Sequence, residues 1–347
     1  MSKKKRGLRF QAQTILKGKL KIGQSKAATK KAAAQAGTNR LDGIYSWETY
    51  HTYEKQTNVF LKWCKENYKN VKTIEDCRAH VSEWLELRAK TTRPATVKLG
   101  VSALAKLYSC TAGDFRFKAP RASRDDIVRS RGTAKRDTGY SETKNEALTN
   151  FCKGTGVRRS DAEHLRGEHL WTRDRMAQRK AELEGKSGLS KAERRQLDAL
   201  RVAEKLPQKY DAFVEVVGSK GGKDRFSPII GAHRQEIIDR FHATPPNRNV
   251  WKNINSHADV HDFRREYATA LYNENARDLE CCKQEKFWNK EHRCGDGKHR
   301  PGYDRDCVYR LRGTHRGEWL DKKAMEVAAL SLGHNRISVI GEHYLKR

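Results

Sequence analysis

Aromatic and aliphatic residues recur every three or four positions from about residue 46, which predicts a helix over 46–68. A second helix is expected after Thr73, because threonine is a good N-cap and Asp76 stands three positions later. A third helix is expected after Pro94, where proline suits the first turn. Together these patterns predict a small helical domain over 41–112.

Two strongly basic stretches flank this domain. Residues 1–40 hold twelve lysines and arginines and no acidic residue, which favours a basic arm over a packed unit. Residues 113–140 combine glycine, proline and basic residues without a long apolar period, which is typical of a linker. The arm could bind a separate DNA site or serve as a nonspecific anchor.

The pattern after residue 141 mixes helical and strand periods. Helices are expected from 141 to about 153 and from about 157, and short β-prone segments follow at 169–172 and 212–218. The second β-prone segment continues into SKGGKDRFSPII, a pattern that predicts a hairpin with a basic tip. The fold class predicted is therefore mainly α with a small antiparallel β-sheet (α+β).

Two insertions are expected within this second domain, which spans 141–347. Residues 174–206 are dense in charged residues, leucine and alanine and predict an exposed helical pair between strands. The other insertion, over about 275–317, contains glycine, cysteine and histidine residues and interrupts the helical pattern. We expect the two insertions to be candidates for subunit coupling, because only three residues follow Tyr344.

Net charge narrows the class of partner. The chain has 347 residues and a formal net charge of +29, which favours an acidic partner, nucleic acid above all. Its sequence lacks the roughly 18 uninterrupted apolar residues of a membrane helix and the apolar run of a secretory signal. We therefore expect a cytoplasmic protein, associated with the nucleoid of a prokaryotic host, with no membrane partner.

Cysteine and histidine gather in the second insertion and invite a zinc interpretation. No Cys-x-x-Cys knuckle is present, so thiols in a loop are the alternative, and our expectation is no metal and no cofactor. The candidate ligands are Cys281, Cys282, Cys294, His299 and Cys307, with His292 and His315 nearby.

The first candidate site for chemistry is the glycine turn that delivers Arg158. Asp161 stands three residues later on the same helical face, where a carboxylate can orient a guanidinium. A surface ion pair is the alternative for this patch taken alone. Arg159 is a second arginine that could enter the site.

The hairpin tip is the second candidate. Lys220, Lys223 and Arg225 could reach a nucleic acid groove, and a solvated turn is the alternative. Lys223 could replace Lys220 in chemistry.

Three further patches follow toward the end of the chain. His261 and Arg264 lie at i and i+3 on one helix and place an imidazole beside a cation, as a reacting phosphate requires. His334 follows Leu-Gly, and Tyr344 lies ten residues later. Taken alone, a tyrosine near a terminus is usually a packed aromatic residue.

Taken together, and in their order along the chain, these patches resemble the catalytic domain of the tyrosine recombinases. This is the family of phage and conjugative-transposon integrases. TGVRRSD resembles the first arginine box, SKGGKDRFSPI the β-hairpin, HDFRREYATALY the second box and LGHNRISVIGEHY the terminal segment. The helical unit over 41–112 resembles the family's core-binding domain. Such a likeness implies a core-binding domain followed by a recombinase catalytic domain.

The resemblance also implies roles for individual residues. Tyr344 would attack the scissile phosphorus and form a 3′-phosphotyrosyl enzyme without metal or ATP. Arg158 and Arg264 would hold the phosphate, and Lys220 would be the general acid for the leaving oxygen. His261 would act as an acid or base near the tyrosine, and His334 would donate a hydrogen bond to the phosphate. Asp161 would support these catalytic residues from behind. Lys223 and Arg225 would contact DNA.

We therefore expect a site-specific DNA recombinase or integrase of a mobile genetic element, acting as a homotetramer on double-stranded DNA. One alternative is a topoisomerase-like enzyme or resolvase that does not exchange partners. Another is a recombinase-fold protein that binds DNA without catalysis. A generic basic nucleic acid-binding module would explain the charge but not the ordered boxes.

Overall fold

The structure is a computed structural model that describes residues 7–38, 41–121, 139–219, 221–279, 307–312 and 315–345. It is mainly helical with a small antiparallel sheet, as the sequence predicts. Two compact units divide the chain at Val128 and Arg129, inside the predicted linker. None of the described helices combines the length and apolar character needed to cross a bilayer.

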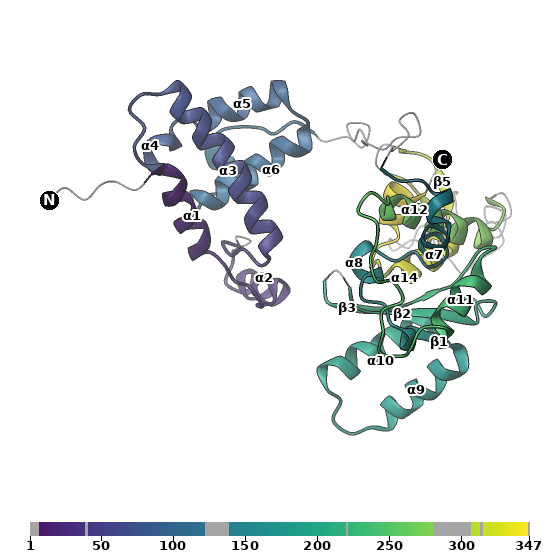
Figure 1. The fold of residues 1–347 in the computed structure, drawn as a ribbon. Coiled ribbons are helices and arrows are strands. Elements are labelled where there is room, and N and C mark those ends of the chain that lie inside the picture. The colour runs from purple at the N-terminus through teal and green to yellow at the C-terminus, as the bar shows by residue number, and fades with distance from the viewer. Residues whose placement is uncertain are drawn as a thin grey trace, which may run out of the picture. The chain divides into compact units, whose positions relative to one another are not determined.

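The described part of the first unit contains six helices and a 3-10 turn, and Figure 1 shows how the helices are arranged. They are α1 (Leu8–Gly18), α2 (Lys26–Gln35), α3 (Trp47–Asn67), α4 (Ile74–Arg78), α5 (Val81–Thr91), α6 (Pro94–Leu107) and η1 (Ala112–Phe115). Local signals fix several of these starts. Ser46 Oγ accepts from the Thr49 amide at 3.2 Å, and Thr73 forms a capping box with Asp76.

The basic N-terminal segment differs from the arm predicted by the sequence. Helix α1 packs into the core of the first unit, with Leu8, Ala12 and Leu16 buried against α3, α4 and α6. Their i, i+4, i+8 spacing forms an apolar stripe that the surrounding lysines obscured. Helix α2, in contrast, buries no side chain.

A core substitution in α1 tests this packing. Leu16 is 0% exposed, so Leu16→Ala is expected to lower the free energy of unfolding of the first unit by about 2–5 kcal/mol. Lys17→Ala, at the adjacent exposed position, should change it by less than about 0.5 kcal/mol. Urea titration of both variants measures the difference, and equal values would contradict a packed α1.

The second unit is built around a three-stranded antiparallel sheet in the order β1-β2-β3. Its strands are β1 (Leu170–Thr172), β2 (Ala212–Ser219) and β3 (Lys223–Pro228). Trp171 pairs with Phe213, and Val214 pairs with Ser227. The hairpin predicted from the Gly-Gly turn is confirmed.

Helices cover both faces of this sheet (Figure 1). Phe213 packs with residues of α9 (Arg173–Gly185) and α10 (Lys191–Ala203), whereas Val214 and Val216 pack with residues of α7 (Glu146–Thr155) and α11 (Arg234–His242). Because the first five residues of β2 are buried on both faces, apolar residues do not alternate with polar ones there, and Glu215 is the one charged residue among them.

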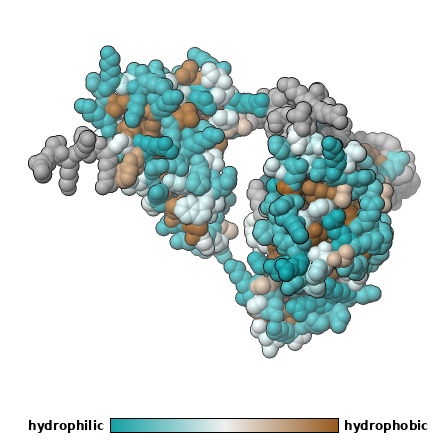
Figure 2. Space-filling view, in the orientation of Figure 1, coloured by the Kyte–Doolittle hydropathy of each residue, from teal (hydrophilic) through white to brown (hydrophobic). Residues whose placement is uncertain are grey.

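Helix α10 is not the exposed insertion that its charged sequence predicts. Leu197, Leu200 and Ala203 are buried, and Gln196 Nε2 donates to Glu215 Oε1 on β2 at 2.7 Å. The helical pair predicted between the strands is confirmed by α9 and α10, but its expected exposure was wrong for α10, whose apolar face is a narrow stripe among charged residues. Both units nevertheless present a largely hydrophilic surface in the view of Figure 2.

The remaining elements complete the described part of the second unit. They are η2 (Thr143–Asn145), α8 (Arg159–Ala162), η3 (Gly167–His169), α12 (Val260–Asn275), β4 (Val308–Arg310), β5 (Trp319–Asp321), α14 (Lys322–Leu332) and the π-helical turn η4 (Ile340–Tyr344). Strands β4 and β5 form a hairpin whose first strand lies in the predicted second insertion. The helix predicted from about 157 is only the short α8.

Candidate active site

The turn between α7 and α8 requires glycine at position 156. Gly156 caps α7 with φ of +61°, and an added Cβ would lie 2.2 Å from Cδ1 of Tyr267. Any other residue would therefore meet both backbone strain and the Tyr267 ring. Arg158 follows two residues later as the N-cap of α8.

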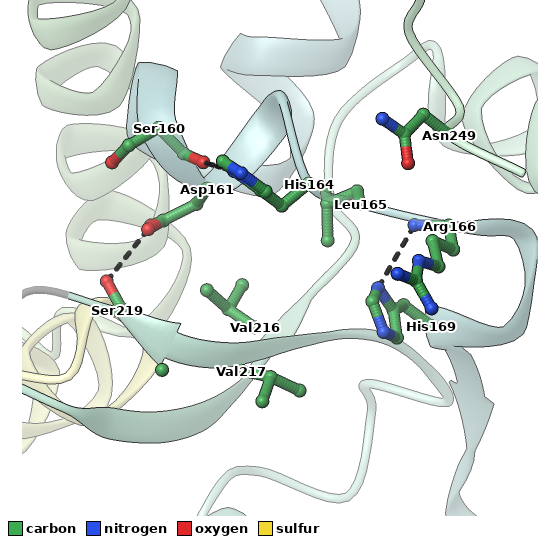
Figure 3. Close-up of a pocket in the computed structure, with 11 residues that line it drawn as sticks. Ser160, Asp161, His164, Leu165, Arg166, His169, Val216, Val217, Ser219 and Asn249 are labelled. Atoms are coloured by element: carbon green, nitrogen blue, oxygen red, sulfur yellow. Dashed lines mark hydrogen bonds between the residues drawn. The ribbon is translucent and has the colours of Figure 1, made fainter. Parts of the chain in front are cut away.

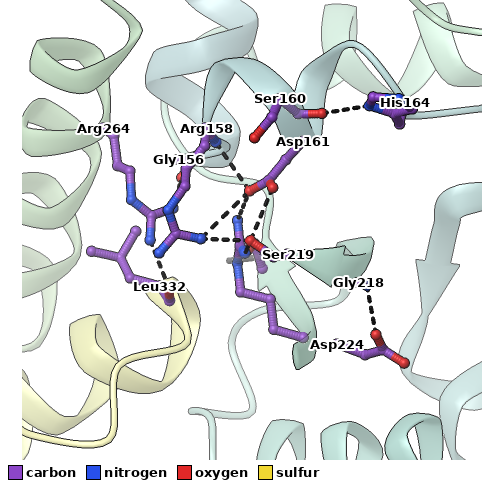
Figure 4. A network of polar contacts seen from close by, with 12 residues as sticks. Gly156, Arg158, Ser160, Asp161, His164, Gly218, Ser219, Asp224, Arg264 and Leu332 are labelled. Atoms are coloured by element: carbon purple, nitrogen blue, oxygen red, sulfur yellow. Dashed lines mark hydrogen bonds and ion pairs between the residues drawn. The ribbon is translucent and has the colours of Figure 1, made fainter. Parts of the chain in front are cut away.

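Arg158 belongs to a compact polar network at the end of β2 (Figure 4). Its Nη1 donates to Ser219 Oγ at 2.6 Å, and its backbone amide donates to Asp161 Oδ2 at 3.2 Å. Ser219 Oγ in turn donates to Asp161 Oδ1 at 2.9 Å. The structure thus places the predicted Arg158 beside the predicted Asp161.

Arg225 completes this network from β3 and differs from its predicted role. Its side chain is 4% exposed and donates to Asp161 Oδ2 at 2.9 Å and to Ser219 Oγ at 3.0 Å. A guanidinium held inside the protein is not a surface contact for DNA, so the sequence interpretation of Arg225 is corrected. Because the hairpin is rich in basic residues, its sequence did not indicate that the Arg225 side chain points inward.

Burial and charge act in opposite directions on the Asp161 carboxyl. Burial raises the pKa of this carboxyl, but Arg225, the Arg158 amide and Ser219 together lower it by more. The pKa therefore lies below the ordinary value. The ionised carboxylate partly offsets two adjacent guanidinium charges. We infer that Asp161 is charged at neutral pH.

The two alternatives to Arg158 and Lys220 have other contacts. The Arg159 guanidinium donates to Asn255 O at 2.8 Å and to Ala258 O at 2.6 Å, which ties down the segment before α12. Lys223 Nζ donates to Asn335 Oδ1. The structure therefore directs Arg158, rather than Arg159, to the network. Lys220 lies outside the described residues.

Arg264 is the most deeply buried cation of the site, with 0% exposure on α12. It donates to the carbonyl of Gly156 and, at 2.7 Å, to that of Leu332. Burial, with Arg225 and Arg158 nearby, lowers the pKa of Arg264 to about 9, so the guanidinium remains protonated at neutral pH. One side chain thus joins the ends of α7 and α14.

Tyr344 lies against this arginine. Arg264 Nε donates to the Tyr344 hydroxyl at 3.5 Å, and the guanidinium carbon lies 5.7 Å from the ring centroid. The rings of His261 and His334 lie 5.7 and 5.0 Å from the same centroid. Four residues from three separate patches of the sequence therefore meet at one point.

The turn that carries Tyr344 packs closely against the β4–β5 hairpin. A Cβ added at Gly341 would lie 2.7 Å from Leu311 Cδ2 and 3.0 Å from Leu320 Cδ1. Only glycine allows this approach, so part of the predicted insertion supports the tyrosine-bearing turn.

Burial, together with the surrounding arginines, holds His334 in its neutral form. Burial, then Arg264, Arg158 and Arg225, lower its pKa to about 4. Its Nε2 atom is buried and has no hydrogen-bond partner among the described residues. A neutral imidazole with an unpaired nitrogen is suited to hydrogen bonding with an anion that enters the site.

This pKa shift predicts a pH dependence. Because the folded pKa lies below the unfolded value, the stability associated with neutral His334 is fully present above about pH 6.5 and declines as pH falls toward 4. We expect the His334 ring resonances to stay constant from pH 8 to about 5 in an NMR titration. A midpoint near 6.5 would contradict the geometry.

A hollow of about 620 Å³ adjoins the arginine network (Figure 3). Asp161 and Ser219 lie at one side of it, and His164, His169 and Asn249 lie farther along. It contains both apolar strand residues and polar side chains. The hollow therefore borders the groups that hold Arg158.

Most of the candidate zinc ligands lie outside the described residues. Cys281, Cys282, Cys294 and His299 are not described, and neither is His292. Within the described residues no group of three or more potential ligands lies together. Cys307 is buried, and His315 Nδ1 lies 2.9 Å from Glu318 Oε1.

Sequence reasoning missed Ser219 and the inward role of Arg225. A serine before a basic turn carries no distinctive signal, because its importance comes from the direction of its side chain.

Comparisons of the sequence with models of protein families and with curated proteins found no match.

Proposed function

We propose that this chain cleaves and rejoins DNA as a tyrosine recombinase, through a covalent bond to Tyr344. The observation that carries the proposal is the Tyr344 hydroxyl at 3.5 Å from a buried arginine, between two histidine rings. Such a cluster supplies a nucleophile, fixed positive charge and groups for proton transfer.

The phosphate would bind between the arginines. Arg264 has five N–H donors, of which its three acceptors in the described part of the chain use three. Arg158 is 25% exposed and can offer a second fork to a non-bridging oxygen. Both guanidiniums would stabilise the charge that develops on the phosphorane.

Proton transfer would use the remaining groups. His261 lies against the Tyr344 ring and would accept the phenolic proton as the oxygen attacks phosphorus. His334 would donate a hydrogen bond to the phosphate. Lys220, on the family resemblance, would protonate the departing 5′ oxygen. Attack by the 5′ hydroxyl of a partner strand would reverse the step and complete strand exchange.

Charge on the first unit suits the same substrate. A groove between α1 and α3 has three cationic side chains in its lining, Arg9, Lys55 and Lys62, against one carboxylate, that of Glu54. Trp47 is 54% exposed on α3. Lysine and arginine bind the phosphate backbone, and an exposed aromatic can contact sugar or base. We therefore propose that this unit binds duplex DNA at recombination sites of a mobile element, in a homotetramer.

A covalent adduct tests the proposal directly. Nicked duplexes from DNA flanking the coding sequence would be incubated with the protein in EDTA, then digested with nuclease and trypsin. We expect a nucleotide adduct on the tryptic peptide 337–346, whose single tyrosine is Tyr344. Tight DNA binding without an adduct, or an adduct on another peptide, would overturn it. Products joined within one duplex would indicate a topoisomerase-like reaction.

A further inference from the structure

Ser219 is the shared acceptor at the centre of the arginine network. Its hydroxyl accepts from Arg158 Nη1 at 2.6 Å and from Arg225 Nη1 at 3.0 Å, and it donates to Asp161 Oδ1 at 2.9 Å. A serine hydroxyl has one donor and two acceptor positions, so these contacts use its full capacity. The side chain is 7% exposed.

An irregularity in the hairpin directs this hydroxyl inward. The β2–β3 register shifts between Val216 and Ser219, and Gly218 adopts φ of +61° within the shift. Asp224 Oδ1 accepts from the Gly218 amide at 2.7 Å and fixes the bend. Val217 is 51% exposed while Ser219 is buried, so the irregularity turns Ser219 toward the network.

Two guanidiniums on one oxygen require a fixed geometry. Arg158 and Arg225 repel each other, and Arg225 is also paired with Asp161. The Arg158 Nη1 atom lies 3.7 Å from Asp161 Oδ2, beyond a hydrogen bond, so its short side-chain contact is with Ser219. The direction of Arg158 therefore depends on the serine hydroxyl more than on the carboxylate.

We propose that Ser219 is a positioning residue for Arg158, which it orients toward the scissile phosphate before DNA is cleaved. This inference rests on the proposed function for its catalytic consequence. Loss of the hydroxyl releases one guanidinium fork and leaves its charge in the site. The cleavage step then slows because the phosphorane meets a misplaced cation.

Ser219→Ala tests the inference, with Ser227→Ala as a matched control. Ser227 is also buried and accepts from Arg225 Nε at 3.2 Å, but it has no contact with Arg158. We expect Ser219→Ala to lower the single-turnover rate of adduct formation about 10- to 100-fold with DNA affinity within about 2-fold. Ser227→Ala should stay within about 3-fold. Equal loss in both variants would overturn the proposal.

Crystal structures of wild type and Ser219→Ala decide the positioning claim without reference to activity. We expect the Arg158 guanidinium to leave its place beside Asp161 in the variant, while Arg225 stays paired with that carboxylate. An unmoved Arg158 would overturn the inference even if cleavage slowed. Failure of the wild type to form any adduct would instead count against the proposed function.

Discussion

Replacement of Tyr344 by phenylalanine is expected to abolish the covalent adduct and to leave DNA affinity within about 2-fold of wild type. Tyr344→Phe removes only the hydroxyl that lies 3.5 Å from Arg264 Nε, and the ring keeps its contacts with His261 and His334. Without the nucleophilic oxygen no bond to phosphorus can form. Denaturing gels of labelled nicked DNA measure the adduct, and a filter assay measures affinity.

Tyr140→Phe provides a matched control for this variant. The Tyr140 hydroxyl pairs with Thr149 Oγ1 at 2.7 Å and not with an arginine of the site, so its loss should leave adduct formation within about 2-fold. An adduct that persists in Tyr344→Phe would assign the nucleophile to another residue. Loss of the adduct in both variants would point to a general effect on the fold.

Arg264→Lys is expected to have the second largest effect, on catalysis and stability together. A lysine ammonium cannot reach the Gly156 and Leu332 carbonyls and the Tyr344 hydroxyl at once, so buried acceptors lose partners. We expect the free energy of unfolding to fall by about 2–4 kcal/mol. The rate of adduct formation should fall by about 100- to 1,000-fold. Urea titration and single-turnover kinetics measure the two effects.

Arg265→Lys, one position along α12, separates the site from the helix. Arg265 Nη1 pairs with Asp262 Oδ1 at 3.0 Å, and a lysine can keep that ion pair. Stability should change by less than about 0.5 kcal/mol and the cleavage rate by less than about 3-fold. A similar loss in Arg264→Lys and Arg265→Lys would contradict the central role given to Arg264.

Sequence reasoning succeeded where the signal is local. Helix α3 follows from the recurrence of apolar residues over 46–68, the start of α4 follows from the cap at Thr73, and the β2–β3 hairpin follows from its Gly-Gly turn. It failed for α1 and the inner face of α10, where a narrow apolar stripe lies among many charges. Such a stripe is recognisable only when the surface it covers is known.

The candidate site could likewise be predicted only in part. Arg264, His334 and Tyr344 could be named because their spacing resembles a known order, and the structure brings them together. The inward direction of Arg225 could not be predicted, because a buried arginine and an exposed one look alike in a hairpin. Its direction depends on Asp161, 64 positions earlier in the chain.

Arg264 joins the ends of α7 and α14 through main-chain oxygens, and this has a consequence for which positions can vary. A carbonyl is present whatever the side chain, so substitution of Leu332 by another apolar residue preserves its contact with the arginine. Position 156 has no such latitude, since its positive φ and the Tyr267 ring exclude a side chain. Sequence drift should therefore be tolerated at one anchor of the cation and forbidden at the other.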